Sequence, residues 1–285
     1  FCLSRGLGDV YKRQHYVCIY NMLVRILSGI VLLLITGSSL IIGGWYLYGI
    51  CIFISLVGMM EYYRVLGINK KLPGIIGYVG ATAYYVSLLM TDECFGILVL
   101  TATAIAMMIA YVATFPKYTI EDIAKGYFGV IYVAVMISYI YLTRKLSDGE
   151  YLAWLIFICS WGSDSFAYLA GVAFGKHKMT PKLSPKKSYE GAVGGIAGAA
   201  VLGALFGVLV KYLTGADYMA AFTAASAIGA TISIFGDLAA SAIKRNKDIK
   251  DYGRLIPGHG GILDRYDSVI FTAPIVYWVL YFIVR

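Results

Sequence analysis

Repeated runs of apolar residues dominate this sequence and restrict it to very few folds. Each run of about 20 residues is long enough to cross a hydrocarbon core of about 30 Å as an α-helix. With 60% hydrophobic and 14% charged residues, the chain also holds more apolar surface than a soluble domain of its length can bury. A soluble protein is therefore excluded, and we predict an all-α polytopic integral membrane protein.

Charged and turn residues divide the apolar runs into about nine predicted transmembrane helices. These spans lie near residues 26–43, 46–60, 73–91, 95–113, 127–143, 151–172, 191–210, 218–240 and 266–284. The loops after the second, fourth, sixth and eighth span hold 16 Lys and Arg residues, whereas the other loops and the C-terminus hold 4. Since basic loops stay in the cytoplasm, we expect the N-terminus inside, the C-terminus outside and any chemistry of the basic loops facing the cytosol.

The chain is expected to fall into three regions. Residues 1–21 are expected to be a non-native leader and N-terminal tail, because residues 9–14 back-translate readily into a sequencing-adapter sequence and Met22 fits a natural start. Residues 22–145 are apolar helices with sparse charge. Residues 146–285 interleave helices with dense Asp, Lys, Gly and Pro, and this region is expected to carry the catalysis.

The charge and the cysteines exclude several classes of site. The net charge is +8, but the basic residues lie in short loops between apolar runs, which suits a membrane surface or an anionic substrate better than nucleic acid. The five cysteines are scattered and form no CxxC pair. Neither a disulfide framework nor a zinc site is indicated.

Asp164 lies inside the sixth apolar run. A carboxylate at bilayer depth costs at least ~2.5 kcal/mol on insertion scales. We therefore expect Asp164 to face a wet or metal-bearing cavity. The alternative is a residue at a helix interface, hydrogen-bonded to neighbouring serines.

The loop after Asp164 combines lysines with glycines and a proline. It carries Ser184, Lys186 and Lys187 ahead of Gly194 and Gly195, which open the next span. Lysines supply positive charge, glycines allow close backbone approach, and a helix N-terminus favours anions. The pattern predicts a triphosphate site, although an ordinary cytoplasmic anchor loop would also be rich in lysine.

Acids and cations recur at the ends of the last two spans. Asp237, Ser241 and Lys244 share one helical face by their spacing of three and four residues. Asp264 and Asp267 lie one turn apart at the start of the last span. Carboxylates gathered from separate helix ends are the usual arrangement for Mg²⁺ that bridges phosphates. A helix end that merely meets the cytosol explains Lys244 but not Asp237.

Two further residues of this segment are candidates for substrate contacts. His259 stands in a glycine-rich stretch with no second histidine near it, so a phosphate contact or a structural hydrogen bond is favoured over metal ligation. Arg265 is expected to neutralise phosphate charge beside Asp264.

Residues 241–267 closely resemble the C-terminal signature of the phosphatidate cytidylyltransferase family. The stretch runs from Ser-Ala-Ile-Lys-Arg through Lys-Asp to His-Gly-Gly-Ile-Leu-Asp-Arg-Tyr-Asp. The resemblance extends to the segment around Asp164, to residues 184–191 and to Gly-Asp-Leu at 236–238, and loosely to Glu-Tyr-Tyr-Arg at 61–64. It implies that CTP reacts with phosphatidic acid to give CDP-diacylglycerol and pyrophosphate for phospholipid synthesis, at the inner membrane.

The resemblance also implies cofactors, partners and residue roles. It implies Mg²⁺, with K⁺ as a further candidate, a homodimer, and no nucleic acid. By motif position, Asp237 and Asp264 are implied to be metal ligands and to act in catalysis together with Ser241 and Lys244. The residues implied to bind substrate are Asp164, Ser184, Lys186, Lys187, His259, Arg265 and Asp267.

Two positions depart from the family pattern, and the sequence leaves other functions open. The family commonly has Glu at the position of Ala240 and Gly at that of Phe166. A CTP-dependent enzyme acting on an ether-lipid phosphate or a polyprenol is one alternative. Another is an ion-coupled transporter in which Asp164 and Asp237 carry protons or sodium. An inactive scaffold would rest only on the two departures.

Overall fold

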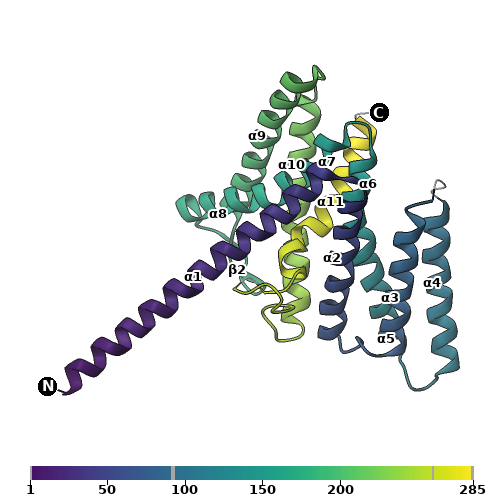
Figure 1. Cartoon of the computed structure of the whole chain (residues 1–285), viewed down its shortest axis with the longest axis horizontal. Coiled ribbons are helices and arrows are strands. Elements are labelled where there is room, and N and C mark those ends of the chain that lie inside the picture. The colour runs from purple at the N-terminus through teal and green to yellow at the C-terminus, as the bar shows by residue number, and fades with distance from the viewer. Residues whose placement is uncertain (1, 91–93, 259, 284–285) are drawn as a thin grey trace.

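The computed structural model describes residues 2–90, 94–258 and 260–283, with side chains from Met22 onward. It is built almost entirely of helices (Figure 1). The first six helical elements are α1 (Cys2–Ile42), α2 (Gly44–Val65), α3 (Leu72–Ser87), α4 (Cys94–Ala113), α5 (Ile120–Gly129) and the π-helix η1 (Val130–Val135). There follow α6 (Met136–Lys145), α7 (Gly149–Phe157), the π-helix η2 (Ile158–Gly162), α8 (Ser163–Phe174), α9 (Tyr189–Thr214), α10 (Met219–Arg245) and α11 (Leu263–Ile283).

A short antiparallel hairpin interrupts the helices between α8 and α9. It consists of β1 (Lys178–Thr180) and β2 (Ser184–Ser188). The sequence predicted this stretch only as a loop, whereas the structure pairs its two arms. The prediction of an all-α polytopic membrane protein is otherwise confirmed.

Eight helical rods among the described residues are long and apolar enough to cross a membrane. One rod joins α5, η1 and α6 over Ile120–Lys145, and another joins α7, η2 and α8 over Gly149–Phe174. Helix α3 overlaps the third predicted span but has 16 residues, fewer than the roughly 20 of a full perpendicular crossing. Each of the nine predicted spans thus overlaps a helix. Among the described residues, eight of these helical rods have full length, and α3 is the short one.

Small residues let the C-terminal helices pack closely around α9. A Cβ atom on Gly195 would lie 2.8 Å from the backbone oxygen of Ser163, and one on Gly198 would lie 2.2 Å from the ring of Phe166. Transmembrane helices use small residues in this way to bring neighbouring backbones together. The bulky Phe166 is therefore accommodated by a glycine on the facing helix.

Tyrosines fill much of the core between the N-terminal helices and α11. Tyr63 is fully buried and donates a hydrogen bond of 2.6 Å to the backbone oxygen of Gly126. The Tyr266 hydroxyl lies 3.0 Å from the hydroxyl of Thr36 on α1. Buried polar groups require such partners. The first contact ties α2 to α5, and the second ties α1 to the last helix.

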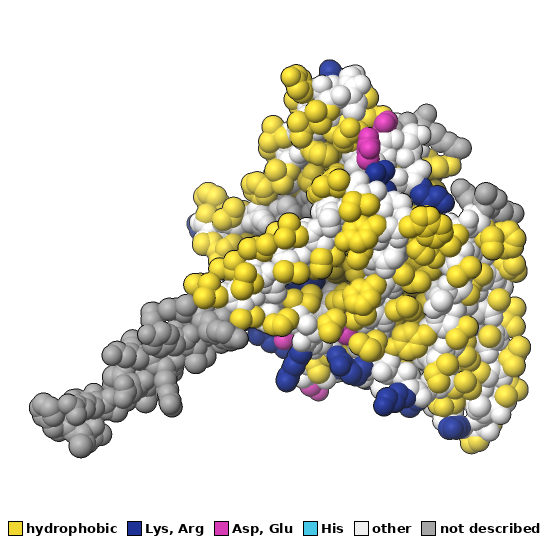
Figure 2. Space-filling model, in the orientation of Figure 1, with side chains coloured by type: hydrophobic (Ala, Val, Ile, Leu, Met, Phe, Trp, Pro, Cys, Tyr) yellow, Lys and Arg dark blue, Asp and Glu magenta, His cyan; other side chains and the backbone are white. Residues whose placement is uncertain are grey.

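The surface is apolar around the middle of the molecule. In the view of Figure 2, hydrophobic side chains cover the helices, while Lys and Arg gather mainly along the lower edge. Apolar helix surfaces with charge at the ends are what a bilayer requires. The chain is an integral membrane protein, and the cytoplasmic position of its N-terminus stays a prediction.

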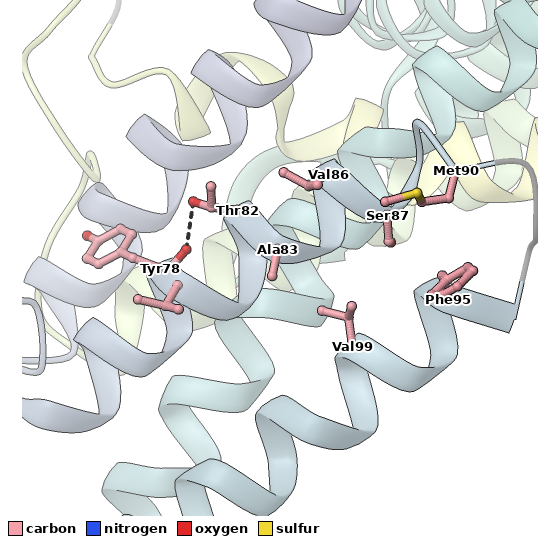
Figure 3. A pocket seen from close by; sticks show the side chains of 9 residues that line it. Tyr78, Thr82, Ala83, Val86, Ser87, Met90, Phe95 and Val99 are labelled. Atoms are coloured by element: carbon pink, nitrogen blue, oxygen red, sulfur yellow. Dashed lines mark hydrogen bonds between the residues drawn. The ribbon is translucent and has the colours of Figure 1, made fainter.

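A large apolar groove of about 660 Å³ lies between α3 and α4 (Figure 3). Its few hydroxyl groups already have hydrogen-bond partners, and the Tyr78 hydroxyl donates to the side-chain oxygen of Asn69 at 2.6 Å. Thr82 donates to the oxygen of Tyr78 at 2.9 Å, and Ser87 donates to that of Tyr84 at 2.7 Å. The groove therefore offers a polar substrate little to bind, and the chemistry has to be sought elsewhere.

Candidate active site

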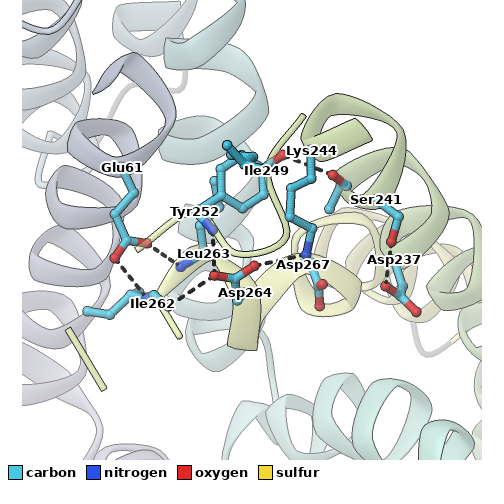
Figure 4. A network of polar contacts seen from close by, with 12 residues as sticks. Glu61, Asp237, Ser241, Lys244, Ile249, Tyr252, Ile262, Leu263, Asp264 and Asp267 are labelled. Carbon is cyan, nitrogen blue, oxygen red and sulfur yellow. Dashed lines mark hydrogen bonds and ion pairs between the residues drawn. The ribbon is translucent and has the colours of Figure 1, made fainter. Parts of the chain in front are cut away.

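The polar face of α10 begins at Asp237. Its helix turn brings the next hydroxyl into range, because Ser241 donates a hydrogen bond of 3.4 Å to the Asp237 carboxylate. Lys244 lies almost two turns after Asp237 on the same side of the helix. The predicted acid, hydroxyl and cation thus follow one another along α10 (Figure 4).

Lys187 on β2 reaches across to α10. Its ammonium group lies 2.7 Å from the Asp237 carboxylate, and both side chains are partly buried. The same ammonium donates to the backbone oxygen of Ile234 at 3.4 Å. The hairpin that the sequence did not predict therefore presents this lysine to the acid on α10.

A cavity of about 250 Å³ surrounds this ion pair. Asp164, Lys186, Lys187, Ser188 and Asp237 contribute its polar walls. Ser188 also caps α9, because its hydroxyl accepts a hydrogen bond of 3.1 Å from the backbone N–H of Gly191. Two lysines, a helix N-terminus and two carboxylates around one space are suited to a polyanion accompanied by a cation.

Three carboxylates from three helices influence one another in this region. Among like charges, Asp237 of α10 interacts most strongly with both Asp164 of α8 and Asp267 of α11. Asp164 also interacts with Lys187, with the hydroxyl of Ser268 and with Arg265. Carboxylates in low-dielectric surroundings repel each other unless positive charge separates them. Asp237 is therefore the centre of an acidic cluster, which we call the Asp237 cluster (Asp164, Asp237 and Asp267).

Asp264 occupies a different and more enclosed environment (Figure 4). One carboxylate oxygen lies 2.8 Å from the Lys244 ammonium. The other accepts hydrogen bonds from the backbone N–H groups of Tyr252 at 2.8 Å and Gly261 at 3.0 Å. The Asp264 side chain is only 2% exposed. These contacts fix the loop between α10 and α11 onto the start of the last helix.

Glu61 of α2 holds the same loop from the other side. Its carboxylate accepts hydrogen bonds from the backbone N–H groups of Ile262 at 3.2 Å and Leu263 at 2.8 Å. A Cβ atom on Gly253 or Gly261 would come within 2.4 Å of this carboxylate. These two glycines are required so that the loop can close around Glu61, whose negative charge also suits the N-terminus of α11.

Tyr252 links the loop to α10. Its hydroxyl donates to the backbone oxygen of Ala240 at 3.2 Å, and the Lys244 ammonium lies 5.4 Å from the centre of its ring. Burial raises the pKa of Tyr252, so its hydroxyl stays protonated and remains a donor. The Ala240 side chain is fully buried, and its carbonyl is part of this junction.

The remaining predicted residues lie at various distances from the cavity. Lys186 lines it, whereas Ser184 lies at the far end of β2, paired with Thr180. Arg265 is half-buried near Asp164, and its Nε atom has no hydrogen-bond partner among the described residues. His259 lies outside the described residues.

No three His, Cys, Asp or Glu side chains in the described part of the chain converge closely enough to hold a metal ion as they stand. The two acids that the sequence grouped as metal ligands also have different surroundings. Asp237 belongs to the cluster beside the cavity, whereas both oxygens of Asp264 already have partners.

Sequence reasoning gave no role to Glu61. Its signal was the loose resemblance of residues 61–64, Glu-Tyr-Tyr-Arg, to the family, which assigned neither side chain a task. In the structure, Arg64 donates to the backbone oxygen of Tyr252 at 3.0 Å. Both side chains of this N-terminal helix therefore hold the C-terminal loop.

Fold and site together define a polytopic membrane protein whose helix ends form a charged cavity suited to phosphate groups. The chain belongs to the cytidylyltransferase family, whose sequence profile matches residues 23–283. It is therefore an enzyme of the nucleotidyltransferase class, and the ion-coupled transporter and the inactive scaffold considered above are set aside.

Curated relatives match nearly the whole chain. The phosphatidate cytidylyltransferase of Bacillus subtilis (strain 168) is 30% identical over 273 residues, which cover 91% of this chain and 98% of the relative. That of Staphylococcus haemolyticus (strain JCSC1435) is 32% identical over 266 residues, covering 90% and 97%. That of Synechocystis sp. (strain ATCC 27184 / PCC 6803 / Kazusa) is 30% identical over 297 residues, covering 89% and 94%.

Proposed function

We propose that this chain transfers a cytidylyl group from CTP to phosphatidic acid, giving CDP-diacylglycerol and pyrophosphate. The curated relatives are named for this activity. They match this chain over almost their full length. The observation that carries the proposal is the Lys187–Asp237 pair at 2.7 Å beside Asp164, in a cavity with Lys186. This arrangement suits a nucleoside triphosphate whose negative charge must be screened.

We further propose Mg²⁺ as the cofactor, with K⁺ as an additional candidate. Hard carboxylate oxygens are the ligands that Mg²⁺ prefers, and a divalent cation would relieve the mutual repulsion within the Asp237 cluster. Asp237 and Asp164 fit this role better than Asp264, whose oxygens are engaged. Bound Mg²⁺ supplies charge screening and orients the phosphates of CTP.

The chemistry requires little from the protein beyond placement and charge. An oxygen of the lipid phosphate attacks the α-phosphorus of CTP, and the bond from that phosphorus to the oxygen bridging to the β-phosphate breaks, so that pyrophosphate leaves. The attacking oxygen is already ionised near neutral pH, so no general base is needed. Lys186 and Lys187 neutralise the phosphates, while Lys244 and Asp264 keep the loop before α11 in position.

The enzyme is proposed to act at the cytosolic face of the inner membrane and to form a homodimer. The excess of Lys and Arg in alternate loops supports the first part of this proposal, and the family resemblance supports the second. CTP is a soluble cytosolic nucleotide, whereas phosphatidic acid arrives from the bilayer. A cavity lined by the start of α8 and by Asp237 of α10, next to a hairpin outside the spans, suits a site that receives both.

The test is a product assay with the purified full chain in detergent. CTP labelled at the α-phosphate, phosphatidic acid and Mg²⁺ should give labelled CDP-diacylglycerol and pyrophosphate in equal amounts, and EDTA should abolish both. Release of CDP with a phosphorylated polyprenol would instead mean phosphoryl transfer. Turnover only with an ether-lipid phosphate would contradict the diacyl acceptor while leaving the reaction type in place.

A further inference from the structure

Tyr132 carries a buried hydroxyl group without a partner. The side chain is 1% exposed, and its oxygen makes no hydrogen bond to the described residues. Leaving a buried hydroxyl unpaired costs about 1–3 kcal/mol. Other tyrosine hydroxyls in the same core have hydrogen-bond partners, namely those of Tyr63, Tyr85 and Tyr266. An uncompensated group of this kind in a native fold needs an explanation.

The ring of Tyr132 is held so firmly that the hydroxyl cannot turn away to water. It stacks on Phe128 with ring centres 5.3 Å apart and planes inclined by 13°. Tyr62 and Phe271 pack against it with centres at 5.8 Å and 6.1 Å. Aromatic pairs at these distances are attractive. The direction of the hydroxyl is therefore set by α2, α5 and α11 together.

The segment that carries Tyr132 is not a regular helix. Tyr132 lies in η1, a π-helical segment of six residues inside the rod from Ile120 to Lys145. One extra residue per turn changes which side chains face the interior. Such π-helical insertions are rare and recur at functional sites. In η1, Tyr132 is buried together with the aliphatic side chains of Val130, Val133 and Ala134.

The ring of Tyr132 contacts the face of α11 that carries Asp267, because Phe271, which packs against it, lies one turn after Asp267. The charged groups that interact with the Tyr132 hydroxyl are the carboxylates of Asp267 and Asp237. One oxygen of Asp267 accepts a hydrogen bond of 2.9 Å from the backbone N–H of Ser268. Within the described residues, no donor bonds its other oxygen. Tyr132 thus brings a donor without an acceptor to the side of α11 that carries an acceptor with spare capacity.

We infer that Tyr132 is a positioning residue for the Asp237 cluster. When Mg²⁺ is bound there, the Tyr132 hydroxyl donates a hydrogen bond to Asp267 and keeps that carboxylate turned toward Asp237 and Asp164. The inference rests on the metal-binding part of the proposed function. Hydrogen bonds from outside the ligand set orient metal-binding carboxylates, and removing one typically lowers metal affinity about 10–100-fold.

The test is a Mg²⁺ titration of the full-length protein in detergent, followed by thermal unfolding without CTP or lipid. Tyr132→Phe removes only the hydroxyl. We expect the Mg²⁺ concentration that gives half of the stabilisation to rise about tenfold. The metal-free Tm should stay equal or rise, because an unpaired buried hydroxyl is lost. In the CTP assay, the Mg²⁺ concentration for half-maximal turnover should rise by a similar factor.

Tyr63→Phe is the matched control. Its hydroxyl already bonds to Gly126, so this variant should lower the metal-free Tm and leave the Mg²⁺ titration unchanged. The inference is overturned if Tyr132→Phe titrates like the wild type, or if Mg²⁺ does not stabilise the wild type at all. A Mg²⁺ titration that shifts as expected supports it even where phosphatidic acid is not converted, so its failure and that of the proposed reaction are distinguishable.

Discussion

Asp237 and Asp264 are both expected to be metal ligands by motif position, but their surroundings in the structure differ sharply. Asp237 is partly exposed beside the cavity and faces Lys187 together with two other acids. Asp264 is enclosed and satisfied by Lys244 and two backbone N–H groups. The first environment suits a cation and phosphates that come and go. The second suits a fixed structural junction.

The two aspartates should therefore respond differently to replacement by asparagine. Asp264→Asn leaves Lys244 buried without its counter-charge, a change that typically destabilises by about 3–5 kcal/mol. We expect a clearly lower Tm and little folded protein. Asp237→Asn should fold with a Tm near that of the wild type and lose Mg²⁺-dependent turnover by about 100-fold, at the upper end of what perturbing a metal site costs.

Thermal unfolding and CTP turnover of both variants check this prediction, with Glu121→Asn as a control at an exposed acid. A wild-type Tm for Asp264→Asn together with a lost Mg²⁺ response would return Asp264 to the metal site that the sequence assigned to it.

Much of the polar site could be predicted from single residues. Asp164 and Asp237 were identifiable because a carboxylate in an apolar run needs a reason. Glu61 was not, because its partners are backbone N–H groups of Ile262 and Leu263, which leave no side-chain pattern in the sequence. Tyr132 is one of 25 tyrosines, and nothing local distinguishes it from the others.

Among the helices and strands, the sequence predicted the rods but not their irregularities. Apolar run length is enough to locate a transmembrane helix. The π-helical segments η1 and η2 depend on packing against neighbouring helices, and apolar periodicity does not reveal them. The hairpin of β1 and β2 was also missed. Its five-residue strand β2 contains a proline and two lysines, a composition that indicates a loop.

The packing of α8 on α9 gives a prediction at the same scale. A Cβ atom on Gly198 would collide with the ring and Cβ of Phe166, so Gly198→Ala should lower the Tm and, by shifting α8 and Asp164, the turnover. Phe166→Ala removes the obstacle. In the double variant we expect the cost of Gly198→Ala to fall by at least about 0.5 kcal/mol, the smallest coupling usual for residues in contact.

A double-mutant cycle of thermal unfolding, with turnover measured on the same four proteins, provides the check. Gly49→Ala is the neutral control, because a Cβ atom there meets nothing within 4 Å. Strict additivity of Gly198→Ala and Phe166→Ala would contradict the close contact of α8 and α9.

For the whole molecule, the loops determine a direction across the membrane. The basic loops follow α2, α4, α8 and α10, and the loops at the opposite ends are poor in Lys and Arg. The hairpin and the loop before α11 therefore share one side of the bilayer with the cavity. By the positive-inside rule, we expect this side to be the cytosol.

Cysteine labelling from outside the cell tests this orientation. Cys94 is exposed at the start of α4, whereas Cys51 and Cys159 are buried. With Cys2 and Cys18 replaced by serine, we expect a membrane-impermeant maleimide to label Cys94 in intact cells. Lys182→Cys in the hairpin, introduced after Cys94→Ser, should react only in permeabilised cells. The reverse pattern would place the cavity outside.

The hydrogen bonds from Ile262 and Leu263 to Glu61 join residues 201 and 202 positions apart in the chain. During synthesis, α2 therefore enters the membrane long before the ribosome has made the N–H groups that its glutamate accepts. The site is completed only when the final helix inserts. A polypeptide interrupted before α11 lacks this closure, so translation that stops early gives no partly active enzyme to consume CTP.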